Sequence, residues 1–455
     1  MSLQTAFHLN RLRRNLYRRT SDLDEMQVKK LRAIVRHAYE NVSFYHRKFR
    51  DAGVKPDDVK SIEDLRKMPV TSKTEMQSIS FQERVASNID LNKCIQRRTS
   101  GSMGQPLTVI VDRDVAKFEE ALWLRAMFEN GLRLRDKIVE VHDPNTASAE
   151  SSNWLQHFGI MRRRKISIFE DPHHQLRLIQ KIGPEAIKGY PSALTLLANL
   201  CEKDGPCSVR PRMIFTGAEL LDGGTRKLIS SAFDAEVLDN YGCNEFTLMA
   251  WECRQHLGYH INSENVVMEF LDDGEEVSHG ERGEVVCTSL INQAMPFIRY
   301  RLGDIGIPSK EPCPCGRTLP LMKVVEGRSD DFLVTLDGKM VSPLIFFPFP
   351  FKDFEWIRQF RIIQESRNKL AVHLVAKEGS KDITEILAGA RQELVRLFGT
   401  EMHVEFNMLA SIDRDSSGKL RKIISHVSND DIFRKSESVG LFYQKTCLDS
   451  AVKRK

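Results

Sequence analysis

The sequence lacks the features that mark a membrane, secreted or low-complexity protein. No uninterrupted apolar run approaches the roughly 20 residues that span a bilayer, and no segment resembles the apolar core of a signal peptide. We find no internal repeat and no low-complexity tract. A large excess of one charge is also missing, since 67 lysines and arginines face 62 acidic residues. The net charge of +5 suits anionic small molecules and does not argue for nucleic acid.

The composition that remains is that of a globular protein. Apolar residues make up 41% of the chain and charged residues 28%, and 455 residues are enough for two or three domains. Nine cysteines, an odd number in a chain without a recognisable export signal, favour reduced thiols and a cytoplasmic location. Residues 1–19 carry five arginines and no acidic residue, as a transit peptide would. However, Leu9, Leu12 and Leu16 have helical spacing and favour a solvated amphipathic helix.

Hydrophobic periodicity predicts a layered α/β body in the first two thirds of the chain. Residues 22–52 carry an apolar stripe at helical spacing and predict one long helix. Further along, short β-branched runs alternate with helical patterns such as residues 192–200; the runs are 137–141, 213–217 and 236–241. Strands that alternate with helices imply parallel pairing and an α/β sheet.

The pattern changes near residue 264 and again after Gly327. Residues 264–291 read as a β-hairpin with a turn at 271–274. After Gly327, three strands, a helix and a further strand are expected at 332–335, 360–363, 370–375, 383–397 and 404–406. The fold class is therefore α/β: a large layered α/β N-terminal domain and a small α+β C-terminal domain. Residues 426–455 carry no clear pattern.

A loop rich in small and hydroxyl residues lies between two β-type runs, at residues 99–106. Its sequence is Thr99-Ser100-Gly101-Ser102-Met103-Gly104-Gln105-Pro106. Glycines let the backbone approach a polyanion closely, and hydroxyls and main-chain N–H groups can hold its oxygens. The loop is not a P-loop, because its glycines are too close together and no lysine follows them. It indicates phosphate binding, and a hairpin turn without a ligand is the alternative.

Two further motifs follow predicted strands, where α/β enzymes place their ligands. In the segment 240–245, Glu245 could hold a hard cation and Tyr241 could stack on a base. The alternative is a strand-to-helix turn in which Glu245 only caps the helix. In the segment 299–304, the Asp304 carboxylate could accept both hydroxyls of a ribose. The alternative is an ordinary surface Arg–Asp turn.

Two charged segments lie near and beyond the expected domain boundary. Residues 327–331 combine a permissive glycine, Arg328 and two carboxylates, which suits a hinge next to a phosphate. A plain charged linker has the same composition. Residues 413–422 form a polar loop that presents Lys419, which could meet an anion or simply be solvated.

The order of these motifs resembles the adenylate-forming superfamily, and within it the phenylacetate–CoA ligase and CapK-type branch. The resemblance covers about residues 25–425 and rests on segments in the same order along the chain. They are 37–45, 99–106, 189–192, 217–219, 241–245, 300–304, 313–317, 327–331 and 418–419. The phosphate loop departs from many relatives, which have lysine and threonine where this chain has Gln105 and Met103.

The resemblance implies a role for each motif and a division of the chain into an adenylation domain, 1–329, and a small mobile domain, 330–455. Lys419, Glu245 and Arg328 would be catalytic: Lys419 would bridge the carboxylate and the α-phosphate, Glu245 would ligate Mg²⁺, and Arg328 would face the α-phosphate. Asp330 would be the hinge, and Tyr190 would shape the acid pocket. The ATP-binding residues would be Thr99, Ser100, Gly101, Ser102, Gly104, Gly217, Ala218, Glu219, Tyr241, Gly242, Asp304 and Arg328.

Four side chains between residues 253 and 315 predict a structural zinc knot. Cys253, Cys313 and Cys315 with one histidine make a sufficient tetrahedral set. The resemblance favours His260 as the fourth ligand, because some relatives in this branch carry such a knot, and His256 is the competitor. Free buried thiols are the alternative without a metal.

The resemblance implies an AMP-forming carboxylate–CoA ligase that adenylates an aryl or acyl acid and then transfers it to CoA. Its substrates would be ATP, CoA and a small carboxylic acid, an aromatic one fitting Tyr190, with Mg²⁺ and structural Zn²⁺. Dimers occur in this branch, so the resemblance allows a homodimer. Two alternatives remain: adenylyl transfer, to a deazaflavin coenzyme or in CapK-type surface-polysaccharide synthesis, and a non-catalytic nucleotide-binding protein.

Overall fold

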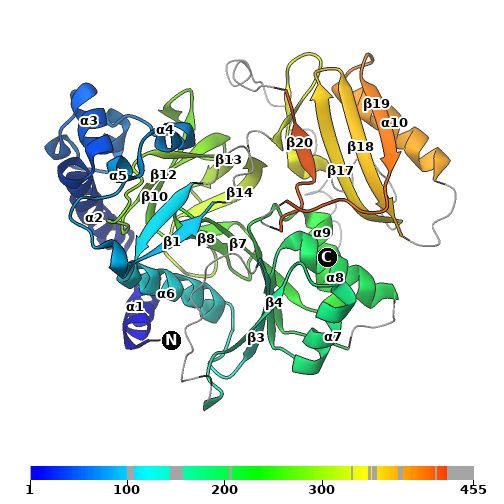
Figure 1. The fold of residues 1–455 in the computed structure, drawn as a ribbon, viewed down its shortest axis with the longest axis horizontal. Helices are drawn as coiled ribbons and strands as arrows, with labels where there is room; N and C mark the ends of the chain where they lie inside the picture. Colours follow the sequence, from blue (N-terminus) through cyan, green and yellow to red (C-terminus); the bar gives the residue numbers. More distant parts are fainter. Residues whose placement is uncertain are drawn as a thin grey trace.

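The computed structural model shows two lobes joined after residue 328 (Figure 1). It describes residues 2–99, 107–143, 156, 158–203, 208–328, 331–346, 350, 356–377, 383–415 and 418–427. The large lobe is built on a twelve-stranded sheet and the small lobe on a four-stranded sheet. The expected α/β architecture with a small α+β unit is therefore confirmed.

Helices at the start of the chain pack against the large lobe. Ser2 caps α1 (Leu3–Asn15), and Leu9, Leu12 and Leu16 are buried against α6 (Arg113–Glu129). The single helix expected over 22–52 is wrong, because α2 (Thr20–Asn41) and α3 (Ser43–Asp51) are separated at Val42. Val42 adopts an extended backbone with φ −118° and buries its side chain, so the second helix starts in a new direction.

Short elements link these helices to the sheet. The helices α4 (Lys73–Ser78) and α5 (Phe81–Arg84) lead to a two-stranded hairpin, β1 (Cys94–Arg98) and β2 (Thr108–Asp112). Its register pairs Arg98 with Thr108, so the two strands that flank the serine- and glycine-rich segment are hydrogen-bonded to each other. The expectation of two β-type runs around that loop is confirmed.

The large sheet changes from parallel to antiparallel half-way across. Its order is β11-β10-β12-β13-β14-β9-β8-β7-β6-β5-β3-β4. The parallel strands are β3 (Lys137–His142), β4 (Arg162–Ser167), β5 (Ala186–Gly189), β6 (Met213–Gly217) and β7 (Glu236–Cys243). The antiparallel strands are β8 (Thr247–Glu252), β9 (Tyr259–Ile261), β10 (Val266–Asp272), β11 (Glu275–Glu276), β12 (Gly283–Ser289), β13 (Tyr300–Ser309) and β14 (Leu321–Arg328).

Helices cover both faces of the parallel half, as such sheets require. On one face α6 packs on the row that includes Ile138, Ala186 and Phe215. On the other face lie α7 (Pro172–Ile182), α8 (Pro191–Lys203) and α9 (Gly223–Phe233), which gather beside β3 and β4 in Figure 1. This layering leaves the carboxyl ends of the strands as the place for a ligand.

The small lobe pairs its strands in the order β19-β18-β17-β20. They are β17 (Ile357–Ser366), β18 (Lys369–Ala376), β19 (His403–Met408) and β20 (Ile423–Ser425); α10 (Thr384–Phe398) covers one face, and β15 (Leu333–Val334) pairs with β16 (Met340–Val341). The sequence pattern does not reveal β20, whose three residues are too short to show a period. This strand matters because the chain reaches it through the Lys419 loop.

None of the described helices combines the length and hydropathy that a bilayer-crossing segment needs. Free thiols are present at Cys94, Cys243, Cys253, Cys287, Cys313 and Cys315. Cys201 is disulfide-bonded, so the expectation of reduced thiols is wrong at that position.

Candidate active site

A cleft of about 1940 Å³ runs between the carboxyl ends of the parallel strands and the small lobe. It gathers the described residues that the sequence singled out for ATP, acid and catalysis: Thr99, Tyr190, Gly217, Ala218, Glu219, Tyr241, Gly242, Glu245, Asp304, Arg328 and Lys419. Segments far apart in the chain therefore line one space. Ser100, Gly101, Ser102, Gly104 and Asp330 lie outside the described residues.

Small residues let the chain turn tightly where β6 ends. A Cβ on Gly217 would lie 2.8 Å from the Asn240 carbonyl oxygen, so only glycine fits there. Ala218 follows with φ +67°, in the left-handed region. The Glu219 carboxylate then accepts hydrogen bonds from the Ser192 N–H and hydroxyl, each at 2.8 Å, and from the Leu420 N–H at 2.7 Å. Glu219 thus connects the large lobe to the small lobe.

Three strands of the large sheet, β7, β13 and β14, bring a phenol, a carboxylate and a guanidinium together. The Tyr241 hydroxyl donates to Asp304 Oδ2 at 2.7 Å, and Arg328 Nε lies 3.8 Å from Asp304 Oδ1. The register of β13 and β14 places Asp304 opposite Arg328. Burial raises the pKa of Asp304, while the Arg328 charge opposes that rise. Asp304 is therefore positioned to accept hydroxyl donors from a ligand.

Glu245 lies in the turn between β7 and β8, where the sheet changes direction. The strand-to-helix alternative is wrong, because β8 and not a helix comes after this turn. A Cβ on Gly242 would come within 2.1 Å of the Thr247 carbonyl oxygen, so the hairpin needs glycine. The Glu245 side chain is largely buried, and the Tyr300 hydroxyl donates to its Oε1 at 3.4 Å. A buried carboxylate with spare acceptor capacity suits a hard cation.

The Lys419 loop enters the cleft from the small lobe. Gly418 has φ +77°, and the Lys419 N–H donates to Asp415 Oδ1 at 3.0 Å, which holds the loop in a tight turn. Arg414 Nη1 donates to the Ser192 hydroxyl at 2.6 Å and to the Gly418 carbonyl at 2.8 Å. Lys419 lines the cleft together with Asp304 and Glu245 of the large lobe.

Lys73 is a cleft residue that the sequence did not reveal. It begins α4 after the Ser72 cap. Burial lowers its pKa; Glu245 opposes that effect, and the Arg328 and Lys419 charges add to it. Lys73 therefore lies in the cleft with Glu245, Arg328 and Lys419. A short capped helix gives no sign in the sequence that its first residue lines the cleft.

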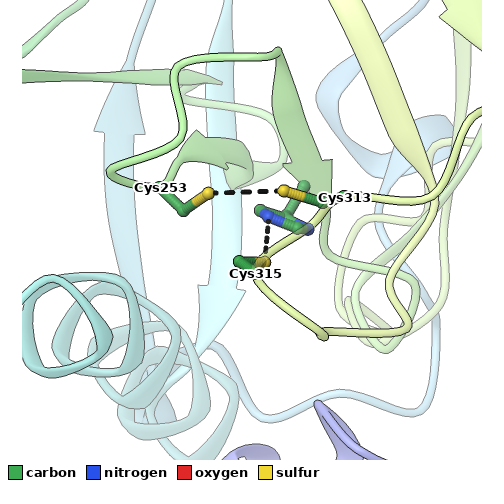
Figure 2. A group of neighbouring side chains, drawn as sticks. Cys253, Cys313 and Cys315 are labelled. Carbon is green, nitrogen blue, oxygen red and sulfur yellow. Dashed lines mark hydrogen bonds between the residues drawn. The ribbon is translucent and has the colours of Figure 1, made fainter.

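The predicted thiol ligands Cys253, Cys313 and Cys315 lie close together (Figure 2). The ligand atoms of Cys253, His260, Cys313 and Cys315 all lie within 4.8 Å of one another. Cys253 Sγ is 3.6 Å from Cys313 Sγ, and Cys315 Sγ is 3.4 Å from His260 Nε2. Cys253 follows β8, His260 is on β9, and the other two precede β14.

The histidine in this cluster is suited to bind a metal ion. His260 is fully buried, and burial, aided by the Arg317 charge, lowers its pKa to about 4, so its ring is neutral. The competing His256 lies outside this cluster, and its Nε2 is 3.5 Å from Glu236 and its Nδ1 3.7 Å from Glu252. The Thr318 N–H and hydroxyl also donate to the Leu16 carbonyl at 2.9 and 3.2 Å, so the loop that supplies Cys313 and Cys315 is held against the end of α1.

Two lobes that face each other across such a cleft, with a basic loop on one side and acid–hydroxyl pairs on the other, fit the adenylate-forming enzyme that the order of the motifs led us to expect. The small lobe matches the CapK C-terminal domain family over residues 333–426. The chain is 30% identical over 339 residues to the phenylacetate–coenzyme A ligase of Escherichia coli, which covers 71% of this chain and 74% of the relative. It therefore belongs to the phenylacetate–CoA ligase family, whose members are AMP-forming acid–CoA ligases.

Other comparisons agree. The phenylacetate–coenzyme A ligase of Thermus thermophilus is 28% identical over 335 residues, 70% of this chain and 73% of the relative. The fold matches a 2-hydroxyisobutyryl-CoA ligase in its postadenylation state with a TM-score of 0.75, at 21% identity, over 95% of this chain and 94% of that chain. The thioesterification state of the same ligase gives 0.64 over the same shares. ATP, a carboxylic acid and CoA are the substrates of such enzymes.

Proposed function

We propose that this enzyme activates a small carboxylic acid with Lys419, Arg328 and Glu245, using residues 1–329 to hold ATP and the acid. Residues 330–455 would form the mobile domain that carries Lys419. The observation that carries this assignment is the cleft that Lys419 of the small lobe lines together with Arg328 and Lys73 of the large lobe. These basic groups would hold a polyanion between the lobes, and ATP supplies one.

In the first half-reaction a carboxylate oxygen of the acid attacks the α-phosphorus of ATP. A new P–O bond forms as the bond to the bridging oxygen breaks, and pyrophosphate leaves. Two anions meet in this step, so Lys419 and Arg328 stabilise the accumulating charge. Asp304, held by Tyr241, would accept the ribose hydroxyls, and the turn at Gly217 and Ala218 would admit the adenine.

A magnesium ion fits the site at Glu245. Its carboxylate is buried and retains acceptor capacity beyond the long contact with Tyr300. Mg²⁺ bound there would neutralise phosphate oxygens. The loop 99–106 would hold the pyrophosphate. At its first residue, the Thr99 hydroxyl accepts a hydrogen bond from the Leu107 N–H at 2.9 Å.

In the second half-reaction the CoA sulfur attacks the carbonyl carbon of the acyl-adenylate, and AMP leaves. The Lys419 loop must first withdraw, with Asp330 as the hinge that absorbs the backbone change. Withdrawal would break the contacts Leu420–Glu219, Arg414–Ser192 and Lys422–Asp222. The better match to a postadenylation structure supports the present arrangement as the one before this rotation.

Structural zinc completes the proposed set of ligands. Three thiols and a neutral histidine within 4.8 Å of one another form a suitable donor set. Zn²⁺ bound there would tie a loop and contribute to folding, with all four positions taken by protein. A cytoplasmic location and a homodimer are also part of the proposal.

A CapK-type enzyme of surface-polysaccharide synthesis is the second candidate, because the CapK C-terminal domain family matches residues 333–426. It would keep the adenylation step and change the acceptor. Acid-dependent exchange between ATP and pyrophosphate, followed with and without CoA, separates the candidates. CoA-dependent release of AMP supports the ligase. Exchange without any thioester supports another acceptor, and no exchange across a broad panel of acids contradicts both.

A further inference from the structure

Charged side chains occupy the interior of the parallel sheet where it lines the cleft. Glu140 on β3 and Lys188 on β5 are opposite each other in register, and Glu140 is also opposite Lys165 on β4. In-register residues of parallel strands point to the same face. That face is otherwise apolar, since Ile138 and Ala186, two residues earlier on β3 and β5, belong to the core under α6.

This placement is unusual for interior strands. Strands buried on both faces of a parallel sheet are normally close to continuous apolar runs. The charges of β4 have a ready explanation, because β4 is the edge strand and charged side chains protect an edge from pairing. Edge protection does not explain Lys188 and Glu140, because β5 and β3 each have a neighbouring strand on both sides.

Three basic side chains line the cleft at this place, namely Lys188, Arg163 and Lys165. The Glu140 carboxylate lines the cleft beside them. Burial lowers the pKa of Lys188; Glu140 works against that effect, and Arg163 and Lys165 add to it. Basic side chains on the wall of the cleft favour an anion that enters this end of it.

A tryptophan connects this charged wall to the reaction site. Lys188 Nζ lies 3.6 Å from the centre of the Trp123 ring, which holds the ammonium group against α6. The Trp123 N–H donates to the Thr247 hydroxyl at 3.3 Å, at the end of the hairpin that carries Glu245. Lys188 also precedes Tyr190, the proposed acid-pocket residue, by two positions. One indole ring therefore lies between Lys188 and the Glu245 hairpin.

We infer that the acid substrate carries a second anionic group at its far end, and that Lys188 selects it. The inference rests on the proposed ligase function and narrows its substrate class to acids with two negative groups, a carboxylate or a phosphate at the end that is not activated. The substrate must be long enough to span Trp123. Lys188, with Arg163 and Lys165 beside it, binds the second anion. The Glu140 carboxylate repels that anion and so lowers the preference for dianionic over neutral acids.

The test compares matched acids by exchange between ATP and pyrophosphate. Phenylacetate is paired with 4-carboxyphenylacetate and 4-phosphonophenylacetate, and hexanoate with adipate. We expect kcat/KM to be higher for the dianionic member of each pair by about tenfold, the factor that corresponds to about 1.4 kcal/mol. The carboxylate and phosphonate arms show which second anion is preferred.

Two variants with opposite expected effects guard against a loss of folding. Lys188→Met should lower the preference for dianionic acids by about tenfold, and Glu140→Gln should raise it. A purely structural Lys188–Glu140 pair would instead change stability and leave the preference alone. Lys181→Met, an exposed lysine on α7 outside the cleft, is the matched control and should not change the preference.

Other outcomes would overturn the inference. Preference of the unaltered enzyme for the neutral acids, or a preference that neither variant changes, would remove the second-anion subsite and leave the ligase function standing. Failure of every acid in both series to support exchange would overturn the ligase function and the subsite together.

Discussion

Replacement of Lys422 by methionine tests the contact between the lobes. Lys422 Nζ donates to Asp222 Oδ2 and to the Thr225 hydroxyl, both at 2.8 Å, and it also lies over the Phe360 ring of its own lobe. Methionine keeps the contact with Phe360 and removes the charge. Because these contacts must break before CoA attacks, Lys422→Met should favour the second half-reaction over the first.

The magnitude can be worked out from the surroundings of the pair. Asp222 is nearly buried, with 7% of its side chain exposed, while Lys422 is 22% exposed, so the pair is more than a surface ion pair. Asp222 still accepts the Thr225 N–H and hydroxyl without the lysine, so no orphaned carboxylate remains. The loss should therefore be about 1–2 kcal/mol, a factor of roughly 5–30 in the equilibrium between the two lobe arrangements.

The assay measures both half-reactions. Adenylation is followed by exchange between ATP and pyrophosphate, and thioester formation by adding CoA to a supplied acyl-adenylate. The ratio of the first rate to the second should fall by about 5–30-fold. Lys227→Met, on the exposed side of α9, is the control and should leave the ratio unchanged. A Lys422→Met enzyme with an unaltered ratio would show that these contacts do not hold the lobes for adenylation.

Three further predictions concern other residues. Lys419→Ala should abolish adenylation and spare thioester formation from a supplied acyl-adenylate; loss of both steps would contradict its role. Cys315→Ser should lower the zinc content measured by elemental analysis and the melting temperature together, and an unaltered protein with less than about half an equivalent of zinc would refute the metal. Burial raises the pKa of Asp239 to about 6, with Glu252 adding to the rise. Because this pKa is higher folded than unfolded, the free energy of unfolding should decrease as pH rises from about 4 to 6, by about 3 kcal/mol from this group. Asp239→Asn should flatten that slope in denaturant titrations, and an unchanged slope would contradict the assignment.

Much of the site was predictable because its residues sit in short motifs at strand ends. Tyr241 lies near the end of β7 and Glu245 follows that strand, as expected, whereas Asp304 lies near the start of β13 and not beyond a strand end. The cluster of Cys253, His260, Cys313 and Cys315 was predictable for a different reason, since cysteine and histidine are few and their spacing limits the choices. The sequence did not decide whether a helix or a strand follows β7, because a hairpin and the start of a helix use the same turn residues. Only the pairing of β7 with β8 decides between them.

The sequence could not reveal features that depend on the partner across a sheet or a cleft. Lys188 and Glu140 each stand alone in their own strand, and only the register between β3 and β5 joins them. Lys73 has no local signal, because its neighbours in the cleft are far away along the chain. The break at Val42 is also tertiary, since the local pattern of residues 22–52 favours an unbroken helix and burial decides the bend.

The hydrogen bonds from Thr318 to the Leu16 carbonyl have a practical consequence for handling this protein. They fasten the first helix of the chain to a loop about three hundred positions downstream, directly beside Cys313 and Cys315. Trimming the leading twenty residues, or fusing a bulky tag onto them, would therefore disturb the thiol cluster from a distance and expose its sulfurs to oxidants. Expression designs should leave that end of the polypeptide intact.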